Sequence, residues 1–265
     1  MRRCCRSIAL GLLGFIATSM TAAQPDAARF SEREALAISQ SAIGRTVGDY
    51  VFSTSSGGSL RLDALQGTPV VVSMIYTSCY HVCPMLTRRI ADMVDVAREA
   101  LGEDSFSVVT IGFDTAVDTP ERMADFARAH GIGRVGWHFL SGDEDTIRGL
   151  SGDLGFIYFP SPKGFDHLSQ TTVLDREGKV YRQVYGQDFA APELVEPLKE
   201  LVYDTPQSAS LVEDWIDTVR LFCTVYDPKS GRYMFDYSIF VTIIVGVLCL
   251  GAVAVFLVRS WRDAV

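Results

Sequence analysis

The most constraining feature of this sequence is a short apolar run, PVVVSMIY, which extends from Pro69 to Tyr76. Near-continuous apolar runs of this length are typical of strands that are buried on both faces. Such strands lie in the middle of α/β sheets, where helices cover both sides. The run therefore predicts a central strand of an α/β sheet.

A loop with two cysteines, YTSCYHVCPM, follows this strand directly. Pro84 suits the first position of a helix, apolar residues from Leu86 to Leu101 recur at helical spacing, and Gly102 ends the pattern. We therefore expect Cys79 and Cys83 at a strand-to-helix turn, with Cys83 at the helix N-terminus. The positive end of the helix dipole lowers the pKa of a thiol in that position, which prepares it as a nucleophile or as a metal ligand.

Strand and helix patterns alternate along the rest of the chain. The expected elements are a helix opened by the capping box at 31–34 and running to about residue 43, a hairpin around 57–58, strands at 107–114 and 137–140, helices at 120–130 and 143–154, a hairpin at 170–175 and 179–185, and a helix at about 192–203. Pro197 makes the middle of the last helix doubtful. This order predicts a thioredoxin-like central sheet flanked by helices at 48–205, after an N-terminal segment at 24–47.

The beginning of the sequence resembles a signal peptide. Arg2, Arg3 and Arg6 precede an apolar core, and small residues lead to Ala23. The core holds about 10 residues, whereas a membrane span needs about 20. We therefore expect residues 1–23 to export the chain, and a retained anchor is the alternative.

A second apolar stretch, from Ile239 to Val258, contains no charged residue. As a helix it would extend about 30 Å, the thickness of the bilayer's hydrocarbon core. We expect a transmembrane helix at 237–258, preceded by a juxtamembrane segment at 206–236 and followed by a cytoplasmic tail at 259–265. These features predict a single-pass protein of the inner (plasma) membrane, with its soluble domain in the periplasm or outside the cell. A buried core helix is the alternative.

The net charge and the cysteine count limit which partners and which reactive residues the protein can have. The formal net charge of −8 argues against nucleic acid as a partner, because nucleic acid binding requires basic patches. Of six cysteines, Cys4 and Cys5 would leave with the signal peptide, and Cys249 lies in the expected membrane helix. Apart from the pair at 79 and 83, one cysteine remains, Cys223. It could be an accessory metal ligand, a dimerising thiol or an idle residue.

The spacing of the cysteine pair bears on its role. A structural disulfide would gain little from closing so small a ring. Thioredoxin-like oxidoreductases use two intervening residues. Three intervening residues, as between Cys79 and Cys83, let both sulfurs converge on one ion, but two thiolates leave a metal site incomplete. A third ligand must then come from elsewhere in the chain.

Four histidines are candidates for the third ligand. His130 is expected at a helix C-terminus, where its positive charge would complement the helix dipole. His138 is expected on a strand. Neither residue therefore needs a role as a metal ligand. His81, within the cysteine loop, is expected to be exposed or to support the ligands. His167 stands in a turn-rich loop before a strand that we expect beside the cysteine strand. His167 could therefore face the two sulfurs.

Three segments together resemble the Sco/SenC family: YTSC-x-x-x-CP, GFDTAVDTPERMADFARAHG, and the DH that precedes LDREGKVYR. They occur in the family's order, and the resemblance covers roughly Val47 to Asp204. It implies a thioredoxin-like copper protein that binds one copper ion, as Cu(I) or Cu(II), through Cys79, Cys83 and His167. It also implies a membrane-anchored metallochaperone that helps to assemble the dinuclear copper centre of cytochrome c oxidase subunit II. Thiol reductants or other copper carriers are further implied partners.

Several positions depart from the family's pattern. Tyr80 and His81 replace a proline and a small or acidic residue inside the loop, Thr115 stands where a proline is usual, and Leu168 stands where a serine is usual. The expected membrane anchor is at the C-terminus rather than the N-terminus. These departures leave the three ligand positions intact.

Other functions stay open beside copper delivery. The cysteine pair could work as a thiol–disulfide oxidoreductase that keeps the client's copper-binding cysteines reduced, through a mixed disulfide. A zinc site would need a fourth ligand, which His81 could supply, and a peroxiredoxin-like peroxidase is a weaker alternative. Asp114, Asp118 and Asp166 are candidates for orienting the ligands, although for Asp118 helix capping and turn formation are the favoured interpretation. We expect a metallochaperone rather than an enzyme in the strict sense.

Overall fold

The structure is a computed structural model that describes residues 30–203, 224–227, 232–235 and 238–263. Two predictions lie outside these residues, the signal peptide at 1–23 and the role of Cys223, and so does most of the juxtamembrane segment predicted at 206–236.

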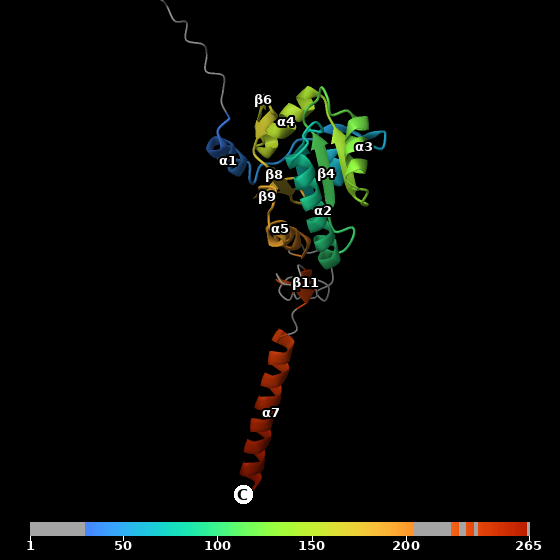
Figure 1. Ribbon diagram of the computed structural model, residues 1–265. Coiled ribbons are helices and arrows are strands. Elements are labelled where there is room, and N and C mark those ends of the chain that lie inside the picture. The colour runs from blue at the N-terminus through green and yellow to red at the C-terminus, as the bar shows by residue number, and fades with distance from the viewer. Residues whose placement is uncertain (1–29, 204–223, 228–231, 236–237, 264–265) are drawn as a thin grey trace, which may run out of the picture.

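A seven-stranded mixed sheet forms the centre of the domain (Figure 1). Its order is β2-β1-β5-β4-β3-β8-β9, and only the neighbours β3, β4 and β5 pair in parallel. The strands are β1 (Val51–Thr54), β2 (Ser59–Arg61), β3 (Val70–Ile75), β4 (Ser107–Gly112), β5 (Trp137–Ser141), β8 (Gln170–Leu174) and β9 (Val180–Tyr185). All six residues of β3 are buried, as the apolar run predicts, because β3 has a neighbour on each side and helices over the sheet. The expected pairing of β8 with the cysteine strand is confirmed.

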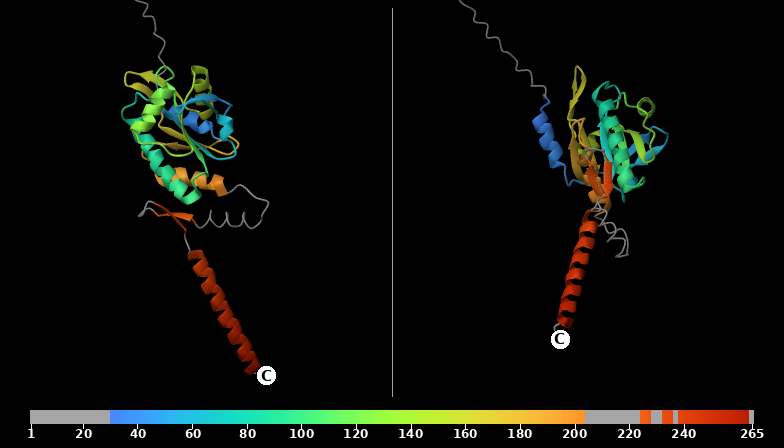
Figure 2. Two further views of the ribbon diagram at one scale, coloured as in Figure 1. Left: turned by 90° about the vertical axis from the view of Figure 1, so that its right-hand side faces the viewer. Right: turned by 60° about the horizontal axis from the view of Figure 1, so that its bottom comes forward.

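Helices cover both faces of the sheet. They are α1 (Glu32–Ser41), the short 3-10 helix η1 (Leu62–Leu65), α2 (Val82–Leu101), α3 (Pro120–Ala129), α4 (Glu144–Leu154) and α5 (Ala191–Tyr203). Helix α2 packs against α5, and α1 lies on the opposite side of the sheet from α2 (Figure 2). The thioredoxin-like arrangement predicted from the sequence is confirmed. Helix α5 continues through Pro197, because its apolar face is buried at Leu194, Val195 and Leu198.

A separate two-stranded hairpin carries His167, where the sequence predicted a turn-rich loop. It consists of β6 (Tyr158–Ser161) and β7 (Gly164–His167), which pair only with each other among the described strands. The loop prediction was wrong although Pro160 and Pro162 are typical of loops, because Pro162 lies in the turn of the hairpin and only Pro160 lies in a strand. Proline is tolerated where a strand has a free edge, since its missing N–H is not needed there.

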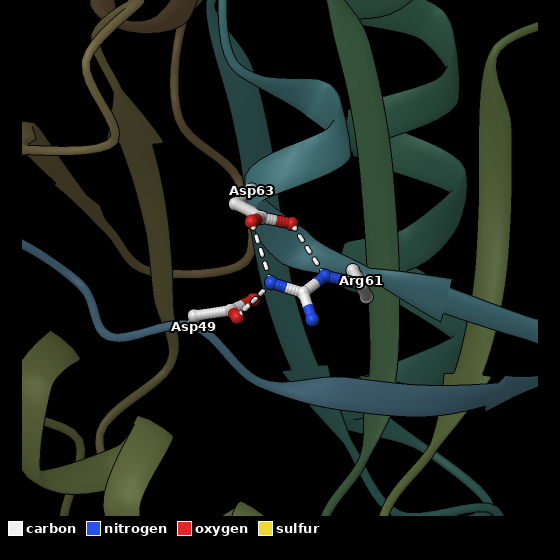
Figure 3. A network of polar contacts seen from close by, with 3 residues as sticks. All are labelled: Asp49, Arg61 and Asp63. Carbon is white, nitrogen blue, oxygen red and sulfur yellow. Dashed lines mark hydrogen bonds and ion pairs between the residues drawn. The ribbon is translucent and has the colours of Figure 1, made fainter.

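An exposed ion-pair network fastens the start of the domain to the β1–β2 hairpin (Figure 3). The Arg61 guanidinium contacts Asp49 and donates from Nε and a terminal nitrogen to Asp63, at 3.1 and 2.8 Å. The side chains are 55%, 43% and 37% exposed for Arg61, Asp49 and Asp63. Exposed pairs of this kind contribute little to stability, because water and salt screen them.

The C-terminal part begins with a short hairpin, β10 (Thr224–Asp227) and β11 (Arg232–Phe235). Helix α7 (Ser238–Asp263) follows and extends away from the sheet (Figure 1). It covers the stretch where the sequence predicts a transmembrane helix. Within the described residues, no helix meets both the length and the apolar character of a membrane span.

Candidate functional site

The two cysteines lie where β3 ends and α2 begins. Helix α2 starts at Val82 rather than at Pro84, so Cys83 belongs to its first turn. Cys83 is 2% exposed, whereas Cys79, in the loop before the helix, is half-buried. Both thiols are free. The backbone N–H of Cys83 donates a hydrogen bond to Cys79 Sγ at 3.4 Å, so the helix N-terminus points at the sulfur of Cys79.

This geometry assigns the reactive thiolate to Cys79. Its pKa is lowered to about 4, mainly because the Cys83 thiol donates a hydrogen bond to it, with backbone N–H groups of Cys83 and His81 and the Tyr76 hydroxyl adding to the effect. The same hydrogen bond, together with burial, raises the pKa of Cys83. The expectation that the helix dipole activates Cys83 was wrong, because the first N–H groups of α2 face back toward the loop.

A buried carboxylate holds the loop in place from the neighbouring connection between β4 and α3. Asp118 is 2% exposed. Its Oδ1 accepts from the backbone N–H of Thr77 at 2.8 Å and from the Thr77 hydroxyl at 2.6 Å. Its Oδ2 accepts from the N–H of Asp114 at 2.9 Å. Thr77 lies two residues before Cys79, so Asp118 fixes the backbone from which that sulfur projects.

The favoured interpretation of Asp118, helix capping and turn formation, was wrong for the cap and right for the turn, because the Asp118 N–H donates to the carbonyl of Asp114 at 2.7 Å. The N-cap of α3 is Thr119, whose hydroxyl accepts from the N–H of Arg122 at 3.3 Å. Asp118 instead turns toward β4, where Gly112 makes room for it. A Cβ at position 112 would lie 2.5 Å from Asp118 Cβ, closer than real atoms approach. The spacing of the GFDTAVD segment therefore serves to insert one carboxylate behind the cysteine loop.

His167 ends β7, with its ring among aromatic side chains. Ring centroids of Phe113 and Phe156 lie 5.4 Å away, and that of Tyr76 lies 6.0 Å away. Burial lowers the pKa of His167, so the imidazole is neutral near pH 7. Its Nδ1 lies 3.0 Å from the carbonyl oxygen of Leu168. Since a carbonyl only accepts, Nδ1 carries the proton and Nε2 keeps a free lone pair, which is the form that binds metals.

Tyr76 connects the histidine to the cysteines. Its ring packs on His167 and Phe165, and its hydroxyl hydrogen-bonds to Cys79, which with burial raises the pKa of Tyr76 to about 12. Gly164, with φ +114°, lets the hairpin approach this ring, because a Cβ there would lie 2.8 Å from the hydroxyl oxygen. Tyr76 was not predicted as a site residue, because its role depends on packing against a hairpin that was not predicted either.

In the structure the two cysteines are therefore hydrogen-bonded to each other, and His167 lies at the same end of the sheet. The thiolate of Cys79 interacts electrostatically with the His167 ring. Among the described residues, however, no three His, Cys, Asp or Glu side chains converge closely enough to hold a metal ion. The donors have the right chemistry for copper: thiolates suit Cu(I), and a neutral imidazole suits Cu(II). The predicted ligands therefore have suitable chemistry for copper, but in this structure they do not converge on one point.

The other candidate residues lie at the margins of this site. His81 is exposed at the N-cap of α2 and makes no capping bond, and Asp166 is exposed beside His167. His138 is on β5, as expected. His130 is the C-cap of α3, but burial and the nearby Arg88 lower its pKa. The prediction that His130 acts there through its positive charge was therefore wrong.

Comparison with known proteins bears on the fold and the family of this chain. A model of the SCO1/SenC family matches residues 39–203. The SCO1 protein homolog of Bacillus subtilis (strain 168) is 22% identical over 167 residues, which cover 61% of this chain and 82% of that relative. The structure of Arabidopsis thaliana ScoI with copper bound has a TM-score of 0.51 at 18% identity, covering 58% of this chain and 97% of that one. BsSco, described as a member of the Sco family of cytochrome c oxidase assembly proteins, has a TM-score of 0.52 at 21% identity, covering 60% and 94%.

At these identities the solved structures establish the fold, which is thioredoxin-like. The family model covers more than half of the chain and includes the cysteine loop, Asp118 and the histidine hairpin. The chain therefore belongs to the SCO1/SenC family.

Proposed function

We propose that this protein is a copper metallochaperone, in which Cys79, Cys83 and His167 hold one copper ion. The observation that carries the proposal is the state of these donors. Cys79 is a thiolate, Cys83 is hydrogen-bonded to it in the same turn, and His167 offers a neutral ring with Nε2 free. Copper bound to such a set would leave a coordination position open, which suits transfer to another protein.

Closure of the three-ligand site would need a movement of the histidine hairpin toward the cysteine loop. Among the described strands, β6 and β7 pair only with each other, so such a movement breaks no hydrogen bond of the main sheet. The contacts that would adjust are the aromatic ones around Tyr76. The Cys83 thiol would lose its proton when copper binds, because the thiolate is the ligand.

The recipient that we propose is the copper-binding domain of cytochrome c oxidase subunit II. The support is membership of the SCO1/SenC family, together with the description of BsSco as a cytochrome c oxidase assembly protein. Copper-loaded protein mixed anaerobically with the reduced, metal-free domain should produce the absorption of the dinuclear centre. The His167→Ala variant should transfer poorly, and absence of transfer by the wild type would contradict the proposal.

A thiol–disulfide oxidoreductase is the second candidate, and the unequal pKa values of the two cysteines favour it. The Cys79 thiolate would attack a client disulfide, forming a Cys79–client disulfide and releasing one client thiolate. Deprotonated Cys83 would then attack Cys79 Sγ and release the second client sulfur. The client disulfide gains two electrons and the pair loses two. In this function His167→Ala should be nearly silent, whereas Cys79→Ser should abolish reduction.

We also propose that the C-terminal helix α7 attaches the protein to the inner membrane, with the copper domain outside the cytoplasm. The support is the uncharged stretch from Ile239 to Val258 and the exposure of its apolar side chains, such as Val241, Leu248 and Leu250. Membrane fractionation of the full chain and of a chain ending at residue 236 tests this. Equal solubility of the two would contradict the attachment.

A further inference from the structure

A hollow of about 330 Å³ opens beside the reactive thiolate, between the cysteine loop and α3. Cys79, Tyr80 and Pro84 line it from the loop side, and Arg122, Phe126 and His130 line it from the side of α3. We call this hollow the Cys79 groove. None of its lining residues on α3 serves the copper site described above.

The groove opens onto one sulfur of the pair. Cys79 is half-buried and lines the groove, whereas Cys83 is 2% exposed and does not. A partner sulfur that attacks the pair, or takes copper from it, would therefore meet Cys79 first. At the rim, the Tyr80 side chain is 92% exposed, and exposed tyrosines are typical anchors of protein interfaces.

The charge around the groove differs from that of the whole chain. The chain carries 32 acidic and 24 basic residues, a formal net charge of −8. Beside the groove, Asp125 is already paired with Arg128. Arg122 has no ion-pair partner among the described residues, and neither has Arg88, whose charge acts on His130 in the groove wall. Two guanidinium groups thus remain available to an incoming carboxylate.

We propose that the Cys79 groove receives an extended segment of the partner protein in which a cysteine is flanked by acidic side chains. The inference rests on the proposed function, because it specifies how the copper-receiving partner presents its thiol. The cysteine approaches Cys79, the carboxylates pair with Arg122 and Arg88, and Tyr80 covers the segment at the rim.

Trapping of short peptides at Cys79 tests the proposal. The full-length chain carrying Cys83→Ser, which cannot resolve a mixed disulfide, is mixed with peptides whose single cysteine is joined to thionitrobenzoate. The Cys79 thiolate attacks the peptide sulfur and thionitrobenzoate leaves, so one S–S bond forms as another breaks. Three peptides differ only in whether glutamate, glutamine or lysine flanks the cysteine. Mass spectrometry of the digest measures the adduct at Cys79 itself.

We expect the glutamate peptide to react at least about tenfold faster than the lysine peptide at low salt, with the difference fading as salt screens the charges. Arg122→Glu should reverse this order. That variant should fold, because residue 122 is the third residue of α3 and glutamate there complements the Thr119 cap. Arg182→Glu, an exposed change on edge strand β9, is the matched control and should keep the wild-type order.

Equal rates for the three peptides at low salt, or an unchanged order in Arg122→Glu, would overturn the groove proposal. A copper titration of Arg122→Glu without the Cys83 change separates this failure from failure of the proposed function. If copper binds normally but the three peptides react at equal rates, the groove proposal alone is rejected. Absence of copper binding in the wild type would reject the proposed function.

Discussion

Two polar clusters of this domain use the same kinds of groups in opposite surroundings. Behind the cysteine loop, the Asp118 carboxylate is buried and accepts three hydrogen bonds, two of them from Thr77. At the β1–β2 hairpin, Arg61 forms ion pairs with Asp49 and Asp63, and all three side chains are exposed to solvent. The surface cluster has the more obvious charges, but the buried cluster sets the geometry of the site. Burial, not the number of ion pairs, decides which cluster matters.

The largest expected effect concerns the reactivity of Cys79, whose thiolate is stabilised by hydrogen bonds in the cysteine loop. Because its pKa is about 4, the thiolate persists to low pH. Alkylation of Cys79 by iodoacetamide should therefore proceed at nearly the same rate at pH 6 and pH 8. An ordinary thiol would slow on the order of 100-fold over that range. The denatured chain is the control, and an ordinary pH profile in the folded protein would contradict the assignment of the thiolate to Cys79.

Asp118→Ala should produce the largest loss of stability in the comparison. It leaves three donors without their acceptor at a buried position, which should cost about 2–4 kcal/mol of unfolding free energy. Asp118→Asn keeps one acceptor oxygen for Thr77 and should cost less. Urea unfolding measures both. If Asp118→Ala unfolds like the wild type, the carboxylate does not hold the loop.

Thr77→Val removes only the hydroxyl and keeps the shape of the side chain. The backbone N–H of Thr77 still donates to Asp118, so the loss should be about 1 kcal/mol. The same urea unfolding detects it. A double-mutant cycle with Asp118→Ala should show coupling, and strictly additive losses would mean that the two side chains act independently.

Arg61→Ala should produce the smallest effect. The network around it is solvent-exposed, so water replaces the lost contacts. The urea midpoint should stay within experimental error at physiological salt. If Arg61→Ala lost as much unfolding free energy as Asp118→Ala, the surface cluster would matter for stability as much as the buried one, which would contradict this expectation.

Much of the fold was predictable because it depends on local pattern. The apolar run from Pro69 to Tyr76 fits a strand buried on both faces, which β3 is, and the capping and glycine signals placed most helices correctly. The β6–β7 hairpin was missed because its prolines suggest a loop. Pairing along a free edge, which the sequence does not reveal, accommodates them.

The sequence names the candidate ligands, which stay a prediction, but it does not show the hydrogen bonds around them. Spacing and resemblance pointed to Cys79, Cys83 and His167. Which cysteine is activated depended on α2 starting at Val82, a shift of two residues from the prediction. The contact between Thr77 and Asp118 spans 41 residues of chain, and nothing local to either residue signals it. Long-range hydrogen bonds of this kind require the sheet to be assembled first.

The central claim, a copper site built from two thiols and a distant imidazole, is tested most directly by anaerobic titration of the reduced full-length chain with Cu(II). The account predicts a sulfur-to-copper charge-transfer band that saturates at one copper per chain. In His167→Ala the band should shift and copper binding should weaken. An unchanged band and affinity in that variant would remove His167 from the site, and no band in the wild type would contradict the copper assignment altogether.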